Sequence, residues 1–369
     1  MSHTLFVGLD VHKEKIVVAI AEEGRSADVR GYGSIDNTPA ALDKLIKKLG
    51  EGGRSLHFCY EAGCCGYGVH RQIVDSGQYC DVIAPSRIPR PTGDRVKTDR
   101  RDAIMLAKLH RAGELTAVWV PDQDHEAMRD LIRSRMAATM QRQTARQQLL
   151  AFLLRHGRSY PGIKTWGRSH YLWLSDQKFE RPAQQAVFQD YVNAVRDGED
   201  RVKRIEQEIE EQVPSWSMGP VVKALCSLRG VSTLVAATVL SATGDLGRFE
   251  CPQQLMSYFG LVPSERSSGG SVRRGGITKC GNNEVRRILI QSAWCYRYTA
   301  RVSRYKADAF AANSSTVRQI AWKAQLRLTK RYRALATRGK PIQVVITAIA
   351  RELLAFMWAI GQVEKPANA

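Results

Sequence analysis

The first 112 residues of this 369-residue chain alternate apolar runs of strand length with segments of helical spacing. Apolar runs and turn residues predict strands over 5–10, 16–20, 27–35, 56–61 and 79–84. Apolar residues at helical spacing predict helices over 38–49 and 68–75. Three strands in a meander followed by alternating helices and strands is the order of a ribonuclease-H-like α/β domain. We therefore expect an α/β domain of this kind at the N-terminus.

Four acidic residues occupy positions where such a domain places a ligand site. Asp10 and Glu61 end predicted strands, and Asp99 and Asp102 share one face at the start of a predicted helix. Carboxylates held side by side repel one another unless a cation lies between them. The four acids therefore indicate a Mg²⁺ site that acts on phosphate esters, in which Mn²⁺ could substitute. Solvated strand ends and a helix-dipole complement are the alternatives for each acid taken singly.

The length of the chain allows two or three domains, each with its own core. We expect three regions, which cover residues 1–115, 122–215 and 220–369. Long amphipathic helices over 125–156 and 183–213, the second interrupted at Gly198, indicate an antiparallel hairpin or coiled coil. Such an arm is most often a spacer or a dimerisation element, and an ordinary helical insert is the alternative.

Neither a run of about 18 apolar residues nor a secretory signal is visible, so we expect a cytoplasmic protein with no membrane partner. The eight cysteines lack zinc-knuckle spacing and are expected to be reduced and mostly packed. Cys64 and Cys65 are adjacent and follow Glu61 closely, but no base lies near them in the sequence. A reactive role for this pair is the minor alternative.

The positive charge of the chain is large and unevenly distributed. The net charge is +19, and residues 264–369 contain 20 Lys and Arg against 5 Asp and Glu. An even distribution of positive charge along the chain would be explained by solubility alone. A concentration of positive charge in one region is typical of proteins that contact phosphate backbones. We expect a nucleic-acid partner for the C-terminal region.

Two segments of this region suit phosphate contact. Residues 228–231 precede an apolar helix and resemble a helix-hairpin-helix turn, with Ser232 where a second glycine is usual. Phosphate contact and plain core packing explain this turn equally well. Residues 267–276 combine three serines, four glycines and two arginines. Glycines allow close approach to a phosphate, arginines neutralise it and a serine oxygen could attack it, although a Gly/Ser segment is also a common linker.

With these motifs in place, the chain resembles the insertion-sequence transposases that join an N-terminal DEDD, RuvC-like domain to a C-terminal transposase domain. This family includes bridge-RNA-guided serine recombinases. The matching segments are Gly8–Asp10 with Lys13, Glu61–Gly63, Lys97–Ala103, Gly260–Pro263, Ser268–Gly269, and Lys279–Asn282 with Arg286 and Arg287. The resemblance covers nearly the whole chain. It implies a RuvC-like α/β domain, a long-helix or coiled-coil region and a mainly α-helical C-terminal domain.

The resemblance also implies roles for individual residues. Asp10, Glu61, Asp99 and Asp102 would be the metal ligands, and Ser268 would be the nucleophile that becomes joined to DNA, with Ser267 and Ser271 as neighbouring alternatives. The expected nucleic-acid contacts are Lys97, Arg100, Arg101, Arg273, Arg274, Lys279, Arg286 and Arg287.

These roles describe a recombinase that cuts and rejoins DNA, with target choice by pairing with an element-encoded guide RNA and with a homodimer or homotetramer as the working assembly. It would act at the nucleoid of a bacterial or archaeal cell.

Proteins of other classes are the alternatives. A hydrolytic nuclease or junction resolvase would use the acidic cluster alone. An actin-like ATPase or sugar kinase would use Gly8–Asp10 as a phosphate loop, and a non-enzymatic DNA-binding protein would leave the acids without a role.

Overall fold

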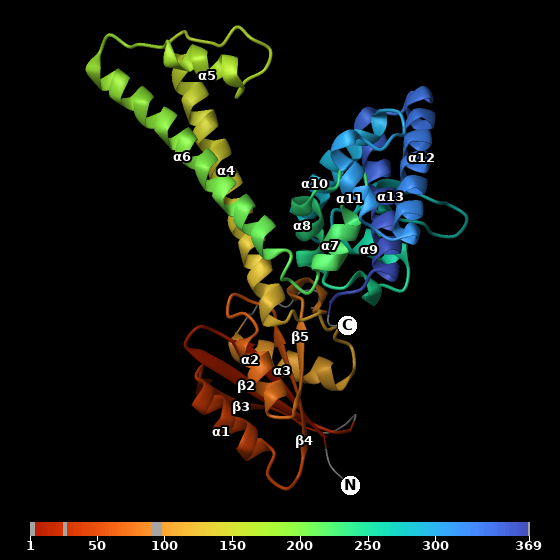
Figure 1. The fold of residues 1–369 in the computed structure, drawn as a ribbon. Helices are drawn as coiled ribbons and strands as arrows, with labels where there is room; N and C mark the ends of the chain where they lie inside the picture. Colours follow the sequence, from red (N-terminus) through yellow and green to blue (C-terminus); the bar gives the residue numbers. More distant parts are fainter. Residues whose placement is uncertain (1–3, 25–27, 90–97, 368–369) are drawn as a thin grey trace. The chain divides into compact units, whose positions relative to one another are not determined.

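The structure, a computed structural model, describes residues 4–24, 28–89 and 98–367. These residues form two compact units, Met1–Val120 and Pro121–Ala369, each with its own core (Figure 1). The first unit is a mixed α/β domain and the second is mostly helical.

A five-stranded sheet with the order β3-β2-β1-β4-β5 forms the centre of the first unit. Its strands are β1 (Thr4–Val11), β2 (Lys15–Glu22), β3 (Val29–Asp36), β4 (Ser55–Glu61) and β5 (Tyr79–Ile83). The first three strands form an antiparallel meander, whereas β4 runs parallel to β1 and β5 parallel to β4. The predicted strands and their order along the chain are confirmed. Because β1, β4 and β5 are parallel, their carboxyl ends lie at one edge of the sheet.

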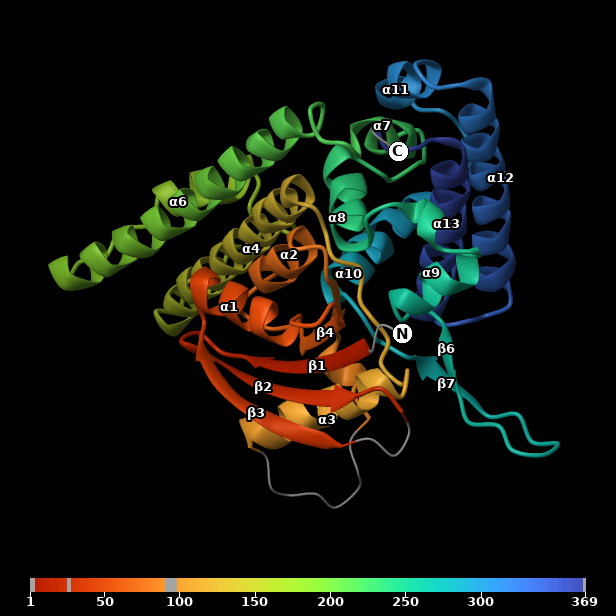
Figure 2. The ribbon, with the colours of Figure 1, turned by 90° about the horizontal axis from the view of Figure 1, so that it is seen from below.

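Three helices cover the two faces of this sheet, namely α1 (Pro39–Leu49), α2 (Gly68–Asp75) and α3 (Asp99–Arg111). Figure 2 shows α1 and α2 on one face and α3 on the other. On the α3 face, Gly8 meets the helix backbone so closely that a Cβ at this position would lie 2.3 Å from the carbonyl oxygen of Ala103. Glycine in β1 and alanine in α3 thus allow the helix to lie directly on the strand that carries Asp10.

Two long helices, α4 (Gln123–Arg155) and α6 (Pro182–Gln212), pair along their length to form an arm, and the short helix α5 (Arg168–Ser175) lies at its tip (Figure 1). The predicted interruption at Gly198 is wrong, because α6 is continuous through it. A Cβ at Gly198 would lie 3.2 Å from the Cα and Cβ atoms of Arg142. The glycine therefore allows close approach of the two helices. Ion pairs of Arg135 with Glu206 and of Arg146 with Glu199 also join them.

The rest of the second unit is a helical domain with one small hairpin. Its helices are α7 (Gly219–Leu225), α8 (Thr233–Thr243), α9 (Pro252–Tyr258), α10 (Asn283–Ala293), α11 (Ala307–Ala311), α12 (Ser315–Thr337) and α13 (Ile342–Val363). The hairpin is formed by β6 (Pro263–Glu265) and β7 (Arg274–Ile277). Short 3₁₀ helices cover Pro85–Arg87, Leu246–Arg248, Trp294–Arg297 and Arg304–Lys306.

Helix α13 is long and apolar enough to cross a membrane by length and composition, a stretch that the sequence-based expectation missed. Arg351 and Glu352 interrupt its apolar run. Nine of its residues are buried, among them Ile349, Leu353 and Met357, in the core that α13 shares with α9, α10 and α12. Within the described structure α13 is the central helix of a folded domain.

Candidate functional site

Asp10 and Glu61 lie at the same edge of the sheet, as predicted from their strand-end positions. The parallel register of β1 and β4 pairs Leu9 with Tyr60, so the residue after each is an acid at the carboxyl end of its strand. Both side chains are half-buried. Ligand sites of α/β sheets form at this edge, because side chains from neighbouring strands meet there.

Helix α3 brings the third and fourth acids. Thr98 is its N-cap and accepts a hydrogen bond from the backbone N–H of Arg101 at 3.3 Å, which fixes where the helix begins. Asp99 and Asp102 therefore occupy the first turn of the helix. Asp99 is largely exposed, whereas Asp102 is half-buried.

A histidine that was not predicted from the sequence connects two of these acids. The Nε2 atom of His12 lies 3.2 Å from an Oδ atom of Asp10 and 3.6 Å from an Oδ atom of Asp99. One ligand atom from each of the three side chains falls within 4.8 Å of the others. The sequence signal was the spacing, since residues two apart at a strand end point to the same face of the sheet.

The electrostatics of this site favour a cation. Burial raises the pKa of Asp10, and the charges of Asp99 and Asp102 raise it further, while the hydrogen bond and charge of His12 act in the opposite direction. Three carboxylates thus repel one another across one site. Oxygen donors with one imidazole nitrogen suit a divalent metal ion, and a bound ion would relieve the repulsion. The structure brings Asp10 and Asp99 together with His12. Asp102 lies close enough for its charge to raise the pKa of Asp10, and Glu61 lies on the adjacent strand end.

The predicted serine segment forms the outer part of the β6–β7 hairpin, which projects from the helical domain (Figure 2). Ser268 and Ser271 face each other across the tip and exchange two backbone hydrogen bonds of 3.2 Å. Between them Gly269 adopts a positive φ of 56°, a conformation that a tight turn requires and glycine adopts readily. The serines are therefore fixed relative to each other by backbone pairing.

The two faces of this hairpin differ in charge. The two strands keep one register, which pairs residues 265 with 274, 266 with 273 and 268 with 271. Alternate residues along each strand therefore share a face. On one face Ser267 donates a hydrogen bond to Glu265 at 2.9 Å, and Arg274 pairs with the same carboxylate at 3.2 Å. The opposite face, here called the serine face, carries Arg266, Ser268, Ser271 and Arg273, all exposed. It carries no carboxylate.

Arg286 lies at the base of the hairpin and is buried, unlike a residue that contacts DNA. Its Nη1 atom donates hydrogen bonds to the carbonyl oxygens of Phe259 at 3.2 Å, Cys280 at 2.5 Å and Gly281 at 3.1 Å. These bonds join the end of α9 to the turn before α10. The structure therefore gives Arg286 an anchoring position.

The other expected contacts occupy varied surroundings. Arg287 forms an ion pair with Glu284, and Lys279 is exposed in a left-handed backbone conformation with φ 58°. The guanidinium of Arg100 lies over β3, where a Cβ on Gly31 would come within 2.9 Å of its Nε atom. Arg101 is exposed in the first turn of α3. Lys97 lies outside the described residues.

The predicted helix-hairpin-helix turn joins α7 to α8. Gly230 has a positive φ of 79°, and a Cβ there would lie 2.5 Å from the carbonyl oxygen of Ser292. Ser232 is the N-cap of α8, and its hydroxyl accepts a hydrogen bond from Val235 at 3.3 Å. Arg229 donates to the carbonyl oxygen of Thr299 at 2.7 Å. These contacts give the turn a packing role.

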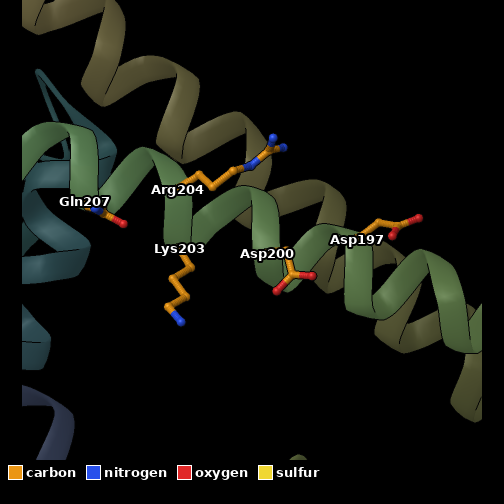
Figure 3. Close-up of a pocket in the computed structure, with 5 residues that line it drawn as sticks. All are labelled: Asp197, Asp200, Lys203, Arg204 and Gln207. Atoms are coloured by element: carbon orange, nitrogen blue, oxygen red, sulfur yellow. The ribbon is translucent and has the colours of Figure 1, made fainter.

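A shallow groove runs along α6 in the middle of the arm (Figure 3). Its lining residues are Asp197, Asp200, Lys203, Arg204 and Gln207. Figure 3 shows these side chains pointing in different directions from one helix. The mixture of both charges, without converging groups, is typical of a solvated helix face.

The eight cysteines are free thiols, and Cys59 and Cys80 are buried.

An α/β domain with a carboxylate site, followed by a basic helical domain with a serine hairpin, is the architecture of an enzyme that acts on nucleic acid. The chain belongs to the IS110 family of transposases, whose members cut and rejoin DNA. Residues 7–157 match the DEDD transposase domain of IS110 elements, and residues 222–308 match the "Transposase IS116/IS110/IS902 family" domain.

Relatives from several bacteria are similar along most of this chain. The putative transposase y4qE of Sinorhizobium fredii is 52% identical over 97% of this chain and 88% of its own length. The transposase for insertion sequence IS1533 of Leptospira borgpetersenii is 32% identical over 93% of this chain and 99% of its own. The pilin gene-inverting protein of Moraxella bovis is 24% identical over 74% of this chain and 69% of its own.

Proposed function

We propose that this transposase cuts and rejoins DNA with a serine nucleophile, Ser268, together with a metal site formed by Asp10, Glu61, Asp99 and Asp102. The observation that carries the proposal is the composition of the serine face. Ser268 lies beside two arginines with no carboxylate on its side of the hairpin, so a phosphate can approach its hydroxyl without repulsion. Ser267 is the weaker choice, because its hydroxyl already donates to Glu265.

The acidic site supports the second part of this proposal. The order β3-β2-β1-β4-β5, with acids at the carboxyl ends of β1 and β4 and on α3, fits a ribonuclease-H-like, RuvC-like domain. Mg²⁺ bound by these carboxylates would act as a Lewis acid on the scissile phosphate. The carboxylates would position the phosphodiester, and one of them would accept the proton of the serine hydroxyl, which is a weak nucleophile without a base.

The proposed transfer balances without an external energy source. The Oγ atom of Ser268 forms a bond to phosphorus as the bond from phosphorus to the DNA 3′ oxygen breaks. The proton of the serine passes to a carboxylate, which hands it on to the departing 3′ oxygen, so that this oxygen leaves as a hydroxyl. The phosphoserine bond conserves the energy of the phosphodiester, so a second 3′ hydroxyl can reverse the step on a new strand. Arg266 and Arg273 would stabilise the charge on the phosphate.

A nicked suicide substrate tests the nucleophile, because loss of a short fragment traps the protein on DNA. We expect a covalent adduct with the wild type and no adduct with Ser268→Ala, while Ser267→Ala retains most of it. Mass spectrometry of the linked peptide identifies the serine directly. Cleavage to free ends without any adduct would establish the hydrolytic nuclease alternative instead.

The metal site is tested by removing one ligand charge. Asp10→Asn and Asp102→Asn are each expected to lower strand cleavage by at least about a hundredfold, since metal-bound carboxylates act as one unit. Nucleic-acid binding measured in low salt should remain within about threefold of wild type. Full cleavage by either variant in the presence of a chelator would contradict the proposal.

We further propose a homodimer or homotetramer, joined through the arm, and an element-encoded RNA that selects the target by base pairing. Met140 and Leu154 on α4 support the first point, because they are 70% and 68% exposed and lie two heptads apart on one face. Light scattering of the wild type and of the Met140→Lys and Leu154→Lys variants tests whether the arm joins the oligomer.

The proposed guide RNA is tested by RNase treatment. We expect recombination to be lost on treatment and restored when the element's transcript is added. The cytoplasm is the expected place of action.

A further inference from the structure

Beyond the four acids, we propose that His12 is a nitrogen ligand of the metal in the acidic site and makes the site prefer Mn²⁺ over Mg²⁺. The inference rests on the proposed metal function. It starts from the two short distances of its Nε2 atom, 3.2 Å to Asp10 and 3.6 Å to Asp99. Metal–ligand bonds of about 2.1 Å place neighbouring ligand atoms of an octahedral site roughly 3.0 Å apart. The three side chains are already close to that spacing.

The backbone of His12 is held by two hydrogen bonds, so the fold places its side chain beside the acidic site. Its N–H donates to the carbonyl oxygen of Lys15 at 2.9 Å, which closes the turn between β1 and β2. Its own carbonyl oxygen accepts a hydrogen bond from the side chain of Asn37 at 2.8 Å. Lys15 begins β2 and Asn37 directly follows β3, so both bonds tie His12 to the meander. The backbone position of His12 is therefore set by the fold itself.

Strand alternation puts His12 on the correct face of the sheet. Gly8, Asp10 and His12 are each two residues apart and point to the face that α3 covers. Val11, between them, packs on the opposite side against the core beneath α1 and α2. Since Asp99 arrives on α3, the histidine and both aspartates converge from a strand end and a helix start.

A nitrogen donor alters which ion the site favours. Sites built only from carboxylates accept both Mg²⁺ and Mn²⁺, whereas an added imidazole strengthens binding of the transition metal and leaves Mg²⁺ binding little changed. Removal of the nitrogen should therefore weaken Mn²⁺ binding more than Mg²⁺ binding. A histidine that only donates a hydrogen bond to Asp10 would affect both ions alike.

Direct metal binding separates these roles without measuring activity. We expect the electron spin echo modulation of the Mn²⁺-loaded protein to show coupling to a directly bound ¹⁴N nucleus. This signal should change to the ¹⁵N pattern when histidine is labelled with ¹⁵N. In His12→Gln, which keeps a hydrogen-bonding group but no imidazole, this modulation should disappear and the Mn²⁺ dissociation constant should rise about tenfold. The Mg²⁺ constant, measured by competition, should rise less than threefold.

Two controls define the outcome. Glu14→Gln removes an exposed charge from the same turn and should leave the nitrogen signal and both constants unchanged. Asp10→Asn should abolish binding at the site. If the wild type binds Mn²⁺ without nitrogen modulation and Asp10→Asn abolishes this binding, the role of His12 is overturned and the proposed metal function stays intact. A wild type that binds no Mn²⁺ at all would overturn both.

Discussion

At the scale of single residues, burial determines how several ionisable groups behave. His170 is fully buried at the tip of the arm, between the rings of Tyr160, Trp166 and Trp173. Neither of its ring nitrogens has a hydrogen-bond partner among the residues that the structure describes. Burial, reinforced by the charge of Arg146, lowers its pKa. The neutral ring is therefore favoured in the folded arm.

We predict that the arm loses stability on acidification because of this histidine. Since its folded pKa lies below its unfolded value of about 6.5, the unfolded chain binds the proton more readily, and stability falls as the pH drops from about 7 toward the folded pKa. Above that window the histidine has no pH effect. His170→Phe should remove part of the loss, by a few degrees in a melting experiment between pH 7.5 and 5.5.

The matched control is His156→Phe, which changes a half-exposed histidine of the same arm that also packs between aromatic rings. Its melting curve should keep the pH dependence of the wild type. If His170→Phe and the wild type lose stability in parallel, burial of this ring is not the cause.

At the scale of secondary-structure elements, the hairpin separates two sets of arginines that are mixed in the sequence. Arg266 and Arg273 lie on the serine face, whereas Arg274 pairs with Glu265 on the other. We predict that Arg266→Ala and Arg273→Ala each lower the rate of adduct formation on the suicide substrate about 10- to 100-fold, because each removes a donor to the developing charge. Arg274→Ala should change the rate less than threefold. Equal losses for all three would show that only the total charge matters.

The sequence predicted the elements well and the partners of their side chains less well. Strands such as β1 and helices such as α1 follow from local apolar spacing and from caps like Thr38, so their bounds could be read from a few residues. Arg286 depends on Phe259 and Cys280, which lie elsewhere in the chain. No local pattern distinguishes such an anchored arginine from an exposed one.

The same reasoning explains the candidate sites. The four acids could be predicted because strand ends and a helix start have recognisable sequences. His12 was missed, since its role depends on Asp99 reaching it from α3, a contact between distant segments. The hairpin could not be predicted from the sequence, because glycine and serine favour no strand and only pairing across the tip defines its two faces.

At the scale of the whole molecule, the exposed side of α12 carries part of the C-terminal excess of positive charge. Arg318, Lys323, Lys330 and Arg333 are exposed there, with no ion pair to any part of the chain that the structure describes. Trp322, 39% exposed, lies among them. By contrast, Arg327 and Arg331 on the same helix pair with Glu352. We expect the four unpaired cations to contact the phosphate backbone.

We predict that α12 sets much of the salt dependence of DNA binding. Each neutralised phosphate contributes roughly −0.9 to the slope of log affinity against log salt on duplex DNA, so Lys323→Gln with Lys330→Gln should reduce the slope by about 1.8. Affinity should fall similarly for unrelated sequences, because backbone contacts carry no sequence information. Lys44→Gln with Lys47→Gln, the same charge change on exposed α1, should leave the slope unchanged. Should the α1 pair reduce the slope and the α12 pair not, the DNA lies along the α/β domain instead.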